Sequence, residues 1–212
     1  MAEVEDPQYL FKLIVIGPGK AGKTTFIIRL IHDEFEESYV PTLGVDFSDK
    51  TFVVDGAAVS TQFWDVGGQD EFRSVVKYYY RGAHCSLVIC DILDPRSWEK
   101  ALKWKSDLDA TVSFSNSDAP IPAILLFNKC DLPYKATDEE LEEIAKKGKF
   151  DAWYKVSVKD DFGLDEAVVE LLRRTISMHD EFNDTESEEE DSGFIDVTGK
   201  ETTPGGGGCC GK

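Results

Sequence analysis

Residues 10–30, LFKLIVIGPGKAGKTTFIIRL, are the stretch around which the rest of this sequence is interpreted. Residues 13–16 form a short apolar run typical of a buried strand, and the apolar positions after residue 25 recur at helical spacing. Between these two segments, residues 17–24 match the pattern G-x-x-x-x-G-K-[ST]. The sequence therefore predicts a phosphate-binding loop between a strand and a helix N-terminus.

The residue types of this loop suit a phosphate chain. Glycines let the backbone wrap around phosphate oxygens, and consecutive N–H groups at the positive end of a helix attract negative charge. We expect Lys23 to reach the β- and γ-phosphates and the Thr24 hydroxyl to become a ligand of Mg²⁺. A glycine turn that binds nothing is the alternative interpretation, and the motifs further along the chain weigh against it.

The composition is that of a soluble globular protein with a large surplus of acidic residues. The 212 residues are 42% hydrophobic and 30% charged, which is enough for one well-buried domain. The net charge is −18, and residues 180–201 contribute half of it through ten acidic side chains against one lysine. Such a charge argues against binding to the phosphate backbone of nucleic acids.

Neither a targeting peptide nor a membrane-spanning segment is expected. No apolar run approaches the roughly 18 residues that would cross a bilayer. The N-terminal MAEVEDPQY is acidic and has no apolar core, so it is not a signal peptide. Cys85, Cys90 and Cys130 lie in or beside apolar runs without C-x-x-C spacing, which favours reduced core thiols. We expect the protein in the cytosol and on the cytoplasmic face of intracellular membranes.

The middle of the chain alternates apolar strands with amphipathic helices, which predicts an α/β fold. Asp55-Gly56 is the strongest hairpin signal, so the two strands that flank it are expected to be antiparallel neighbours. The expected architecture is a P-loop NTPase fold with a six-stranded, mostly parallel sheet and five flanking helices. The expected strands are 10–16, 45–54 (antiparallel), 59–65, 85–91, 122–128 and 153–157, and the expected helices are 22–32, 70–80, 96–110, 138–147 and 164–178.

Three regions are expected along the chain: an N-terminal extension (1–9), the folded domain (10–178) and a tail (179–212). The tail has few apolar residues, dense negative charge and a terminal glycine run, so it should be disordered. It ends in GGGGCCGK. A flexible acidic tether with two cysteines near its end is the resulting expectation.

Two further motifs follow the loop. Thr42 lies in a stretch that reads as a loop, where its hydroxyl can reach the metal and its N–H a terminal phosphate. In FWDVGGQ, Asp65 ends a strand and can hold Mg²⁺ through water, while Gly68 can turn its N–H onto the γ-phosphate. Gln69 is then placed to orient an attacking water. For this motif alone, a strand that ends in a simple Asp-Gly turn is an equally good interpretation.

The sequence NKCD follows another apolar run, AILLF. The Asp131 carboxylate can accept two N–H bonds from a guanine edge, which adenine does not offer, and buried mismatches of this kind discriminate strongly. We expect Lys129 to lie against the base and Asn128 to tie this segment to the phosphate loop. Residues 157–159, Ser-Val-Lys, would supply a backbone N–H to the guanine oxygen.

Taken together and in this order, GPGKAGKT, PT, DVGGQ, NKCD and SVK resemble the motifs of the Ras-like small GTPases over about residues 10–178. Within that group the chain is similar to the Rab family, as indicated by LGVDF (43–47), FWDVGGQDEF (63–72), YYRGA (79–83) and the terminal double cysteine. Three segments look like the Rab branch linked to lysosome-related organelles: LKWKSDLDA (102–110), PIPAILLFNKCD (120–131) and GKFDAWYKVSVKD (148–160).

The resemblance implies the roles of individual residues. Gln69 and Lys23 would be catalytic, and Mg²⁺ would be held by Thr24, Thr42 and, through water, Asp65. Phe35 would pack on the guanine and Tyr39 would close over the phosphates. The remaining nucleotide contacts would come from Gly17, Gly19, Lys20, Ala21, Gly22, Thr25, Gly68, Asn128, Lys129, Asp131, Ser157, Val158 and Lys159.

The resemblance also implies surfaces and modifications outside the nucleotide site. Phe47, Trp64 and Tyr79 match an aromatic triad that presents a nucleotide-dependent surface to effectors, although ordinary core packing is the alternative. Cys209 and Cys210 would carry geranylgeranyl groups, because stable membrane anchoring needs two signals and an acidic tail cannot be the second. Ser74 aligns with a switch residue that is phosphorylated in some relatives, and an unmodified serine on a solvated helix is the alternative.

The implied function is a GTP/GDP switch with slow, Mg²⁺-dependent GTP hydrolysis that recruits effectors to membranes in vesicle trafficking. The implied partners are an exchange factor, a GTPase-activating protein, effectors and an escort protein or GDP-dissociation inhibitor, with the protein itself a monomer. Two alternatives stay open. A P-loop nucleoside or small-molecule kinase shares the first motif but leaves NKCD unexplained. A nucleotide-locked scaffold with little turnover is left open by the unusual Lys20 and Gly67.

Overall fold

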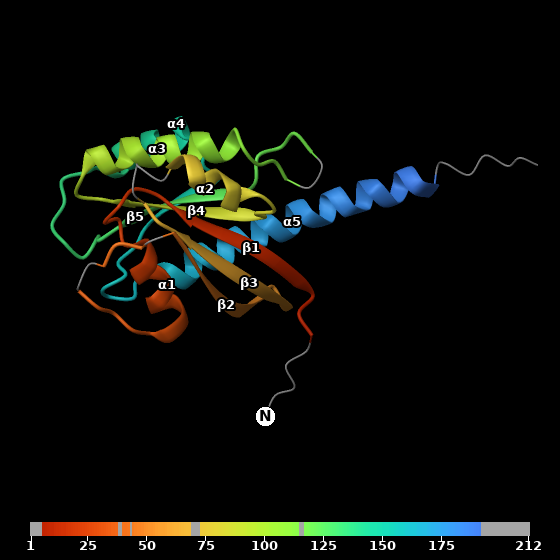
Figure 1. The fold of residues 1–212 in the computed structure, drawn as a ribbon, viewed down its shortest axis with the longest axis horizontal. Coiled ribbons are helices and arrows are strands. Elements are labelled where there is room, and N and C mark those ends of the chain that lie inside the picture. The colour runs from red at the N-terminus through yellow and green to blue at the C-terminus, as the bar shows by residue number, and fades with distance from the viewer. Residues whose placement is uncertain (1–5, 38–39, 43, 69–72, 115–116, 192–212) are drawn as a thin grey trace, which may run out of the picture.

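The computed structural model of this chain describes residues 6–37, 40–42, 44–68, 73–114 and 117–191. They form one central sheet between two layers of helices (Figure 1). In chain order the elements are β1 (Tyr9–Ile16), α1 (Lys23–His32), β2 (Val45–Val54), β3 (Ala57–Val66), α2 (Arg73–Tyr80), β4 (Cys85–Asp91), α3 (Pro95–Asp109), β5 (Ala123–Asn128), α4 (Asp138–Lys147), β6 (Ala152–Lys155) and α5 (Leu164–Asp191).

The sheet confirms the expected fold class. Its strand order is β2-β3-β1-β4-β5-β6, and every neighbouring pair is parallel except β2 with β3. The β2–β3 hairpin turns at Asp55 and Gly56, whose φ angles of 50° and 91° are those of the turn that matches strand twist. Since β1 lies between β3 and β4, the loop after β1 lies beside the ends of both neighbours.

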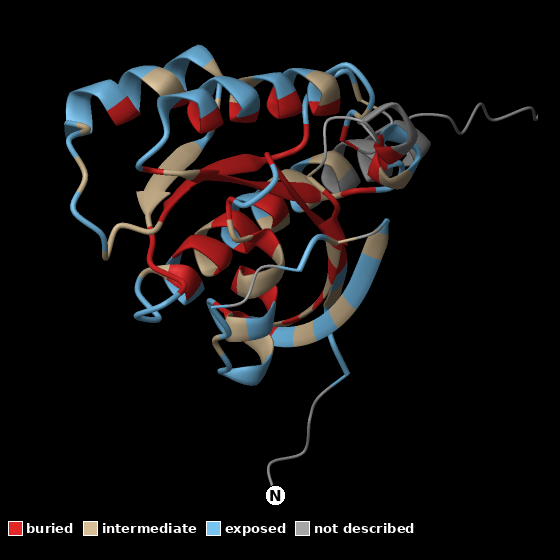
Figure 2. Cartoon of the chain, turned by 60° about the vertical axis from the view of Figure 1, so that its left-hand side comes forward, coloured by how far each residue is buried: buried red, intermediate tan, exposed pale blue. Residues whose placement is uncertain are grey.

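Alternate side chains of the buried central strands point to opposite faces and build two cores. Phe11, Leu13 and Val15 of β1 pack with α1 and α5, whereas Ile14 and Ile16 pack on the other face with α2, α3 and α4. Figure 2 shows the inner faces of the helices and the central strands as buried and the outer helix faces as exposed. The two cores hold the carboxyl ends of the parallel strands at one edge, where binding sites of open α/β sheets lie.

Helix starts agree with local sequence signals. The Thr137 side chain accepts the N–H of Glu140, and the Glu140 carboxylate accepts the N–H of Thr137, which is a complete capping box. Asp94 caps α3, with Pro95 in the first turn. Apart from the end of α5, the boundaries coincide with expectation or differ by one or two residues, and the expected start of the second helix at residue 70 lies outside the described residues.

The last helix corrects one expectation. We expected it to end at residue 178 and a disordered tail to follow, but α5 runs to Asp191. Its extension has tertiary contacts that the charge pattern did not reveal: the ring of Phe182 lies 5.6 Å from that of Phe114, and the Tyr9 hydroxyl donates to the Asp180 carboxylate at 3.0 Å. The expectation of disorder is therefore wrong for residues 179–191, and residues 192–212 lie outside the description.

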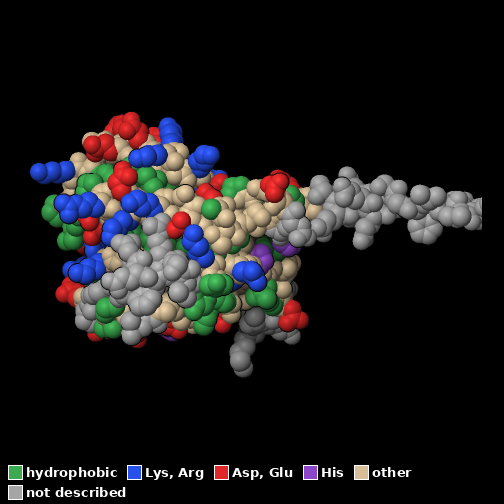
Figure 3. Space-filling model, turned by 45° about the horizontal axis from the view of Figure 1, so that its top comes forward, with side chains coloured by type: hydrophobic (Ala, Val, Ile, Leu, Met, Phe, Trp, Pro, Cys, Tyr) green, Lys and Arg blue, Asp and Glu red, His purple; other side chains and the backbone are tan. Residues whose placement is uncertain are grey.

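The surface mixes charges of both signs despite the acidic composition. Figure 3 shows Lys and Arg side chains interspersed with Asp and Glu, with exposed hydrophobic side chains between them. In Figure 1 the extended α5 projects beyond the body of the domain, away from α1. Among the described residues, no helix combines the length and the hydropathy that crossing a membrane would take.

Candidate nucleotide-binding site

The glycine-rich loop leaves β1 and enters α1 through backbone conformations that require glycine. Gly17 has a φ of 137°, and a Cβ there would overlap the carbonyl oxygen of Ile89. Gly22, at the N-cap of α1, has a φ of 95°, and a Cβ there would overlap the side-chain amide of Asn128. The loop therefore packs closely against both neighbouring segments, as the motif predicted.

Lys23 is a buried ammonium group inside this loop. Its Nζ donates to the carbonyl oxygens of Gly17 and Pro18 at 3.0 Å each. Burial lowers the pKa of Lys23 to about 8, while the nearby Asp65 carboxylate opposes the shift. Among the described residues its hydrogen-bond acceptors are two neutral carbonyl groups. A buried cation in such surroundings gains strongly from an additional anion, which fits the expected phosphate contact.

Three oxygen-bearing side chains from separate segments meet beside Lys23. The Thr24 hydroxyl donates to Asp65 Oδ2 at 2.5 Å and lies 2.7 Å from the Thr42 hydroxyl, and the latter is 3.4 Å from the same carboxylate oxygen. Asp65 is 3% exposed, and its other oxygen, Oδ1, is buried and has no hydrogen-bond partner among the residues that the structure describes. Burial raises the pKa of Asp65, while the Thr24 hydrogen bond lowers it.

These donors fit a magnesium ion. Mg²⁺ prefers oxygen ligands, keeps several waters and is bound through one or two carboxylates together with substrate phosphates. A buried carboxylate oxygen that lacks a protein partner is the atom that a metal-bound water would satisfy. The residues expected for the metal, Thr24, Thr42 and Asp65, are thus brought together.

Gly68 lies directly over the loop. A Cβ at this position would overlap Lys23 Nζ and would lie 2.6 Å from the Gly17 carbonyl oxygen and 2.7 Å from the Gly19 nitrogen. The preceding Gly67 donates its N–H to the Gly44 carbonyl at 3.0 Å, which links the segments that carry Asp65 and Thr42. Gly68 is therefore in the expected position above the phosphate-binding segment.

Asn128 joins the second set of motifs to the first. The side chain is 3% exposed, and its amide nitrogen donates to the Ala21 carbonyl at 2.9 Å. Its oxygen accepts the N–H groups of Lys129 and Val158 at 2.8 and 3.2 Å. One amide side chain therefore fixes the phosphate loop, the NKCD segment and the segment after β6 against each other.

The residues expected to read the base lie on these two segments. The Ser157 hydroxyl donates to Asp131 Oδ1 at 2.8 Å, which orients the carboxylate. Arg29 of α1 holds the backbone of the same region, donating to the carbonyls of Val158 and Lys159 at 3.1 and 2.8 Å. Val158 is 3% exposed, and its methyl groups pack in the core between the sheet, α1 and α5.

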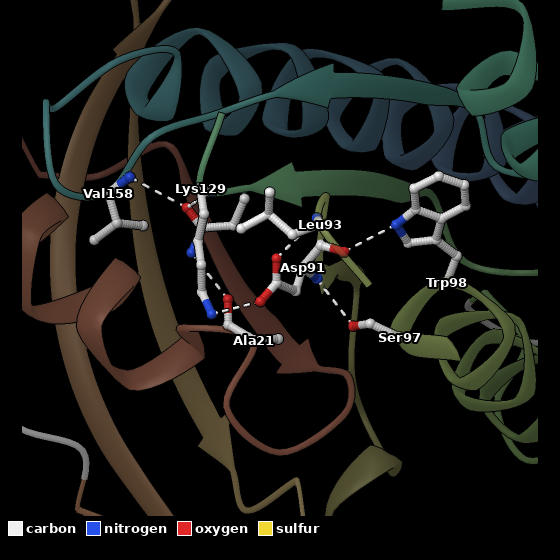
Figure 4. Close-up of polar contacts among 8 residues, drawn as sticks. Ala21, Asp91, Leu93, Ser97, Trp98, Lys129 and Val158 are labelled. Atoms are coloured by element: carbon white, nitrogen blue, oxygen red, sulfur yellow. Dashed lines mark hydrogen bonds and ion pairs between the residues drawn. The ribbon is translucent and has the colours of Figure 1, made fainter. Parts of the chain in front are cut away.

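Sequence reasoning missed the partner of Lys129. Figure 4 shows the Lys129 side chain extending to Asp91, the last residue of β4, where Nζ and Oδ2 lie 2.6 Å apart. Asp91 is far away in sequence but follows the apolar strand CSLVIC directly. An acidic residue at the carboxyl end of a parallel strand is the signal that could have identified it.

The expected effector triad forms a continuous set of rings. Phe47 and Trp64 meet edge to face with centroids 4.4 Å apart, and the Tyr79 centroid lies 6.4 Å from Trp64. Phe47 is 51% exposed, while the other two are half-buried. Lys12, which sequence reasoning missed, lies 3.4 Å over the Trp64 ring and donates to the carbonyls of Tyr79 and Arg81 at 2.7 and 2.8 Å.

The other expected residues divide into three groups. Lys20 is exposed with a φ of 67°, Thr25 is half-buried in α1, and Gly19 is exposed. Phe35 is half-buried against the core, 5.9 Å from the Arg29 guanidinium. Several predicted residues lie outside the described part of the chain, or have side chains that do: Tyr39, Gln69, Ser74, Cys209 and Cys210.

Comparison with known proteins places these features in a wider group. A family model described as the Ras family matches residues 12–177. Ras-related protein Rab-32 of Sus scrofa is 38% identical over 87% of this chain and 82% of its own length. Ras-related protein Rab-7L1 of Homo sapiens is 34% identical over 78% and 82%, and GTP-binding protein YPT1 of Saccharomyces cerevisiae is 32% identical over 95% and 97%.

Proposed function

The chain belongs to the Ras family as a Rab-like small GTPase, and from this premise we propose that the buried loop around Lys23 and the NKCD segment hold GTP or GDP together with Mg²⁺. The expected family and branch are thereby confirmed. GTP hydrolysis and a switch role in membrane trafficking follow from the family. We further propose roles for single residues, a Mg²⁺ site, regulatory proteins and a lipid anchor.

The observation that carries the proposal is the convergence of the Thr24 and Thr42 hydroxyls on Asp65 Oδ2, next to the buried Lys23. Oδ1 of the same carboxylate is buried and has no hydrogen-bond partner among the described residues. When bound, Mg²⁺ would neutralise negative charge on the phosphates of GTP. Thr24 and Thr42 would be its direct ligands, and Asp65 would hold it through water. Their present hydrogen bonds to each other keep these oxygens in place.

The chain's own residues then divide the work of hydrolysis. Lys23 neutralises the negative charge that develops on the phosphates. Electrostatic stabilisation of this kind, together with positioning of the reacting groups, accounts for most of the catalysis of phosphoryl transfer. The backbone N–H of Gly68 donates to the terminal phosphate, and Gln69 orients the attacking water. Asp131 accepts the N–H groups of guanine, while Asn128 keeps the base segment in register with the phosphate loop.

The same contacts explain a switch. Thr42 and Gly68 belong to two separate segments that the Gly67 to Gly44 hydrogen bond connects. Loss of the terminal phosphate removes the anchor of both segments, so the surface formed by Phe47, Trp64 and Tyr79 changes with the nucleotide. Effectors that bind this surface would therefore distinguish GTP from GDP.

Regulation and membrane attachment complete the proposal. Tight binding of both nucleotides calls for an exchange factor, and slow hydrolysis calls for a GTPase-activating protein. Geranylgeranyl groups on Cys209 and Cys210 would hold the protein on endosomal, lysosome-related or Golgi-derived membranes, with an escort protein or GDP-dissociation inhibitor covering them in the cytosol. The scaffold alternative is not favoured, because the relatives belong to a family of GTP hydrolases.

The test compares nucleotides on the purified full-length protein. GTP and GDP should displace a fluorescent GDP analogue at equal low concentrations, whereas ATP should not displace it even at a large excess. Tight ATP binding would refute the assignment of Asp131 to guanine. Single-turnover hydrolysis with a Gln69→Leu control then separates an enzyme from a scaffold, since a scaffold would show no difference between the two proteins.

A further inference from the structure

We propose that Asp91 is a positioning residue for the guanine nucleotide, because its carboxylate holds the ammonium group of Lys129 and thereby keeps the lysine stem against the base. The inference rests on the proposed function and extends it to a residue outside the five motifs. The observation that carries it is the ion pair itself, in which Lys129 Nζ and Asp91 Oδ2 lie 2.6 Å apart.

The lysine starts from a constrained backbone. Lys129 has a φ of 70°, in the left-handed region, and its N–H donates to the side-chain oxygen of Asn128 at 2.8 Å. Its Cα is therefore fixed relative to the phosphate loop through the Asn128 bond to Ala21. A lysine side chain has four rotatable bonds, so without a second fixed point its position would be distributed over many rotamers.

Asp91 is built to be that second point. Its Oδ1 accepts the N–H of Leu93 at 2.9 Å, which leaves Oδ2 directed at the lysine. Its own N–H donates to the Ser97 hydroxyl at 2.9 Å, and its carbonyl accepts the indole N–H of Trp98 at 2.8 Å. Figure 4 shows the carboxylate between α3 and the phosphate loop, with every one of these bonds drawn.

Partial burial strengthens the attraction between Asp91 and Lys129 relative to that of a fully exposed surface ion pair. The Asp91 and Lys129 side chains are 19% and 33% exposed, so solvent screens them only in part. A base that covers the lysine stem would reduce this exposure further. Because both backbone groups of Asp91 are held by the first turn of α3, the position of that helix also determines where the lysine lies.

The test is a double-mutant cycle on GDP release, measured with a fluorescent GDP analogue on the full-length protein. Asp91→Asn keeps an oxygen that can accept the Leu93 N–H but removes the charge that holds Lys129. We expect release to become about threefold to tenfold faster. In a Lys129→Met background the same substitution should change the rate by less than about twofold, since Asp91 acts through the ammonium group.

Two comparisons separate positioning from a general loss of structure. Asp94→Asn removes a carboxylate from the same turn without contacting Lys129, and GDP release should stay within about twofold of the unmodified protein. Inosine diphosphate lacks the amino group that Asp131 would read but has the same ring face. The Asp91→Asn effect should therefore be equal for both nucleotides, whereas damage to the Asp131 contact would affect GDP more than inosine diphosphate, which keeps only one of the two N–H groups that Asp131 would accept.

The outcomes are distinct. Equal acceleration with and without the Lys129→Met substitution, a clearly larger effect on GDP than on inosine diphosphate, or no acceleration at all would each overturn the role of Asp91. If the unmodified protein fails to prefer guanine over adenine nucleotides, the proposed function fails instead, independently of this cycle.

Discussion

Replacing Gly68 by alanine should separate GTP binding from GDP binding. The φ angle of Gly68 lies outside the left-handed region, so the backbone itself tolerates alanine. The added Cβ, however, would lie 2.6 Å from the Gly17 carbonyl oxygen and 2.7 Å from the Gly19 nitrogen. Carbon contacts have their optimum at about 3.5–4.0 Å, so the residue must withdraw by about 1 Å.

A displacement of this size breaks the contact to the terminal phosphate. A hydrogen bond of about 2.9 Å becomes one of about 3.9 Å, which is no longer a hydrogen bond. Losing a hydrogen bond to a charged group costs about 1.5–3 kcal/mol, so GTP affinity should fall at least about tenfold relative to GDP affinity. Single-turnover hydrolysis should slow by about a hundredfold, as for the loss of one donor to a developing charge.

The assay is competition of GTP and GDP against a fluorescent GDP analogue, followed by rapid-quench hydrolysis. Gly82→Ala is the matched control, because a Cβ there meets nothing within 4 Å, while its φ of 71° makes the backbone penalty larger than at Gly68. This control should lower thermal stability without changing hydrolysis. A Gly68→Ala protein that binds and hydrolyses GTP at the unmodified rate would refute the placement of Gly68 over the phosphates.

Three further predictions follow from single residues. Lys23 has a pKa of about 8 in the nucleotide-free protein, and a bound phosphate should raise this pKa. GDP affinity should therefore fall as the pH rises above 8, by up to about tenfold per pH unit, and calorimetry at pH ~8.5 should show proton uptake on binding. An affinity that stays unchanged up to pH ~9 would contradict this. The Lys23 contribution to the free energy of unfolding of the nucleotide-free protein should instead increase between about pH 8 and pH 10.5, because the unfolded chain binds more protons than the folded protein in this range. Asp65→Asn should lower Mg²⁺ affinity about tenfold or more, so that a higher Mg²⁺ concentration is needed to retain GDP. An unaltered Mg²⁺ titration would show that Asp65 does not contribute to the metal site. Phe182→Ala should lower the free energy of unfolding by about 1 kcal/mol and Tm by about 2–4 °C, because it removes the ring that packs against Phe114. Glu181→Ala, at the exposed neighbouring position, should leave Tm unchanged. Equal Tm values for the two variants would show that α5 does not depend on the Phe114 contact.

Much of the fold and of the phosphate site could be predicted because the relevant residues are close together in sequence. The run from Tyr9 to Thr24 carries the strand, the turn glycines and the lysine in one segment, so local conformation and the predicted function depend on the same residues. The Asp55-Gly56 hairpin and the Thr137 capping box are equally local. Such signals depend on φ angles and hydrogen bonds between near neighbours, which the amino-acid types themselves determine.

Other contacts were out of reach for the opposite reason. Lys129 and Asp91 are 38 positions apart, and their pairing depends on β4 and β5 being adjacent and in register. Lys12 reaches the end of α2 and the face of Trp64 only because β1 lies between β3 and β4. A lysine or an aspartate has too many equivalent positions along a sequence for charge alone to select its partner.

The extension of α5 illustrates the same division. The sequence of this extension favours disorder, because like charges repel and few apolar residues are present. In the folded protein the Phe182 ring packs against that of Phe114, and Asp180 accepts the hydroxyl of Tyr9. Both partners lie on distant segments, so the local sequence does not reveal them. Residue type and spacing alone were sufficient for the loop between β1 and α1 and for the order of the motifs that indicate the family, and they make Asp131 the proposed guanine-reading residue. The oxygens around Asp65, the Asp91 anchor and the continuation of α5 as far as Phe182 were determined by tertiary structure, because each needs groups that only the folded domain brings within hydrogen-bonding or packing distance.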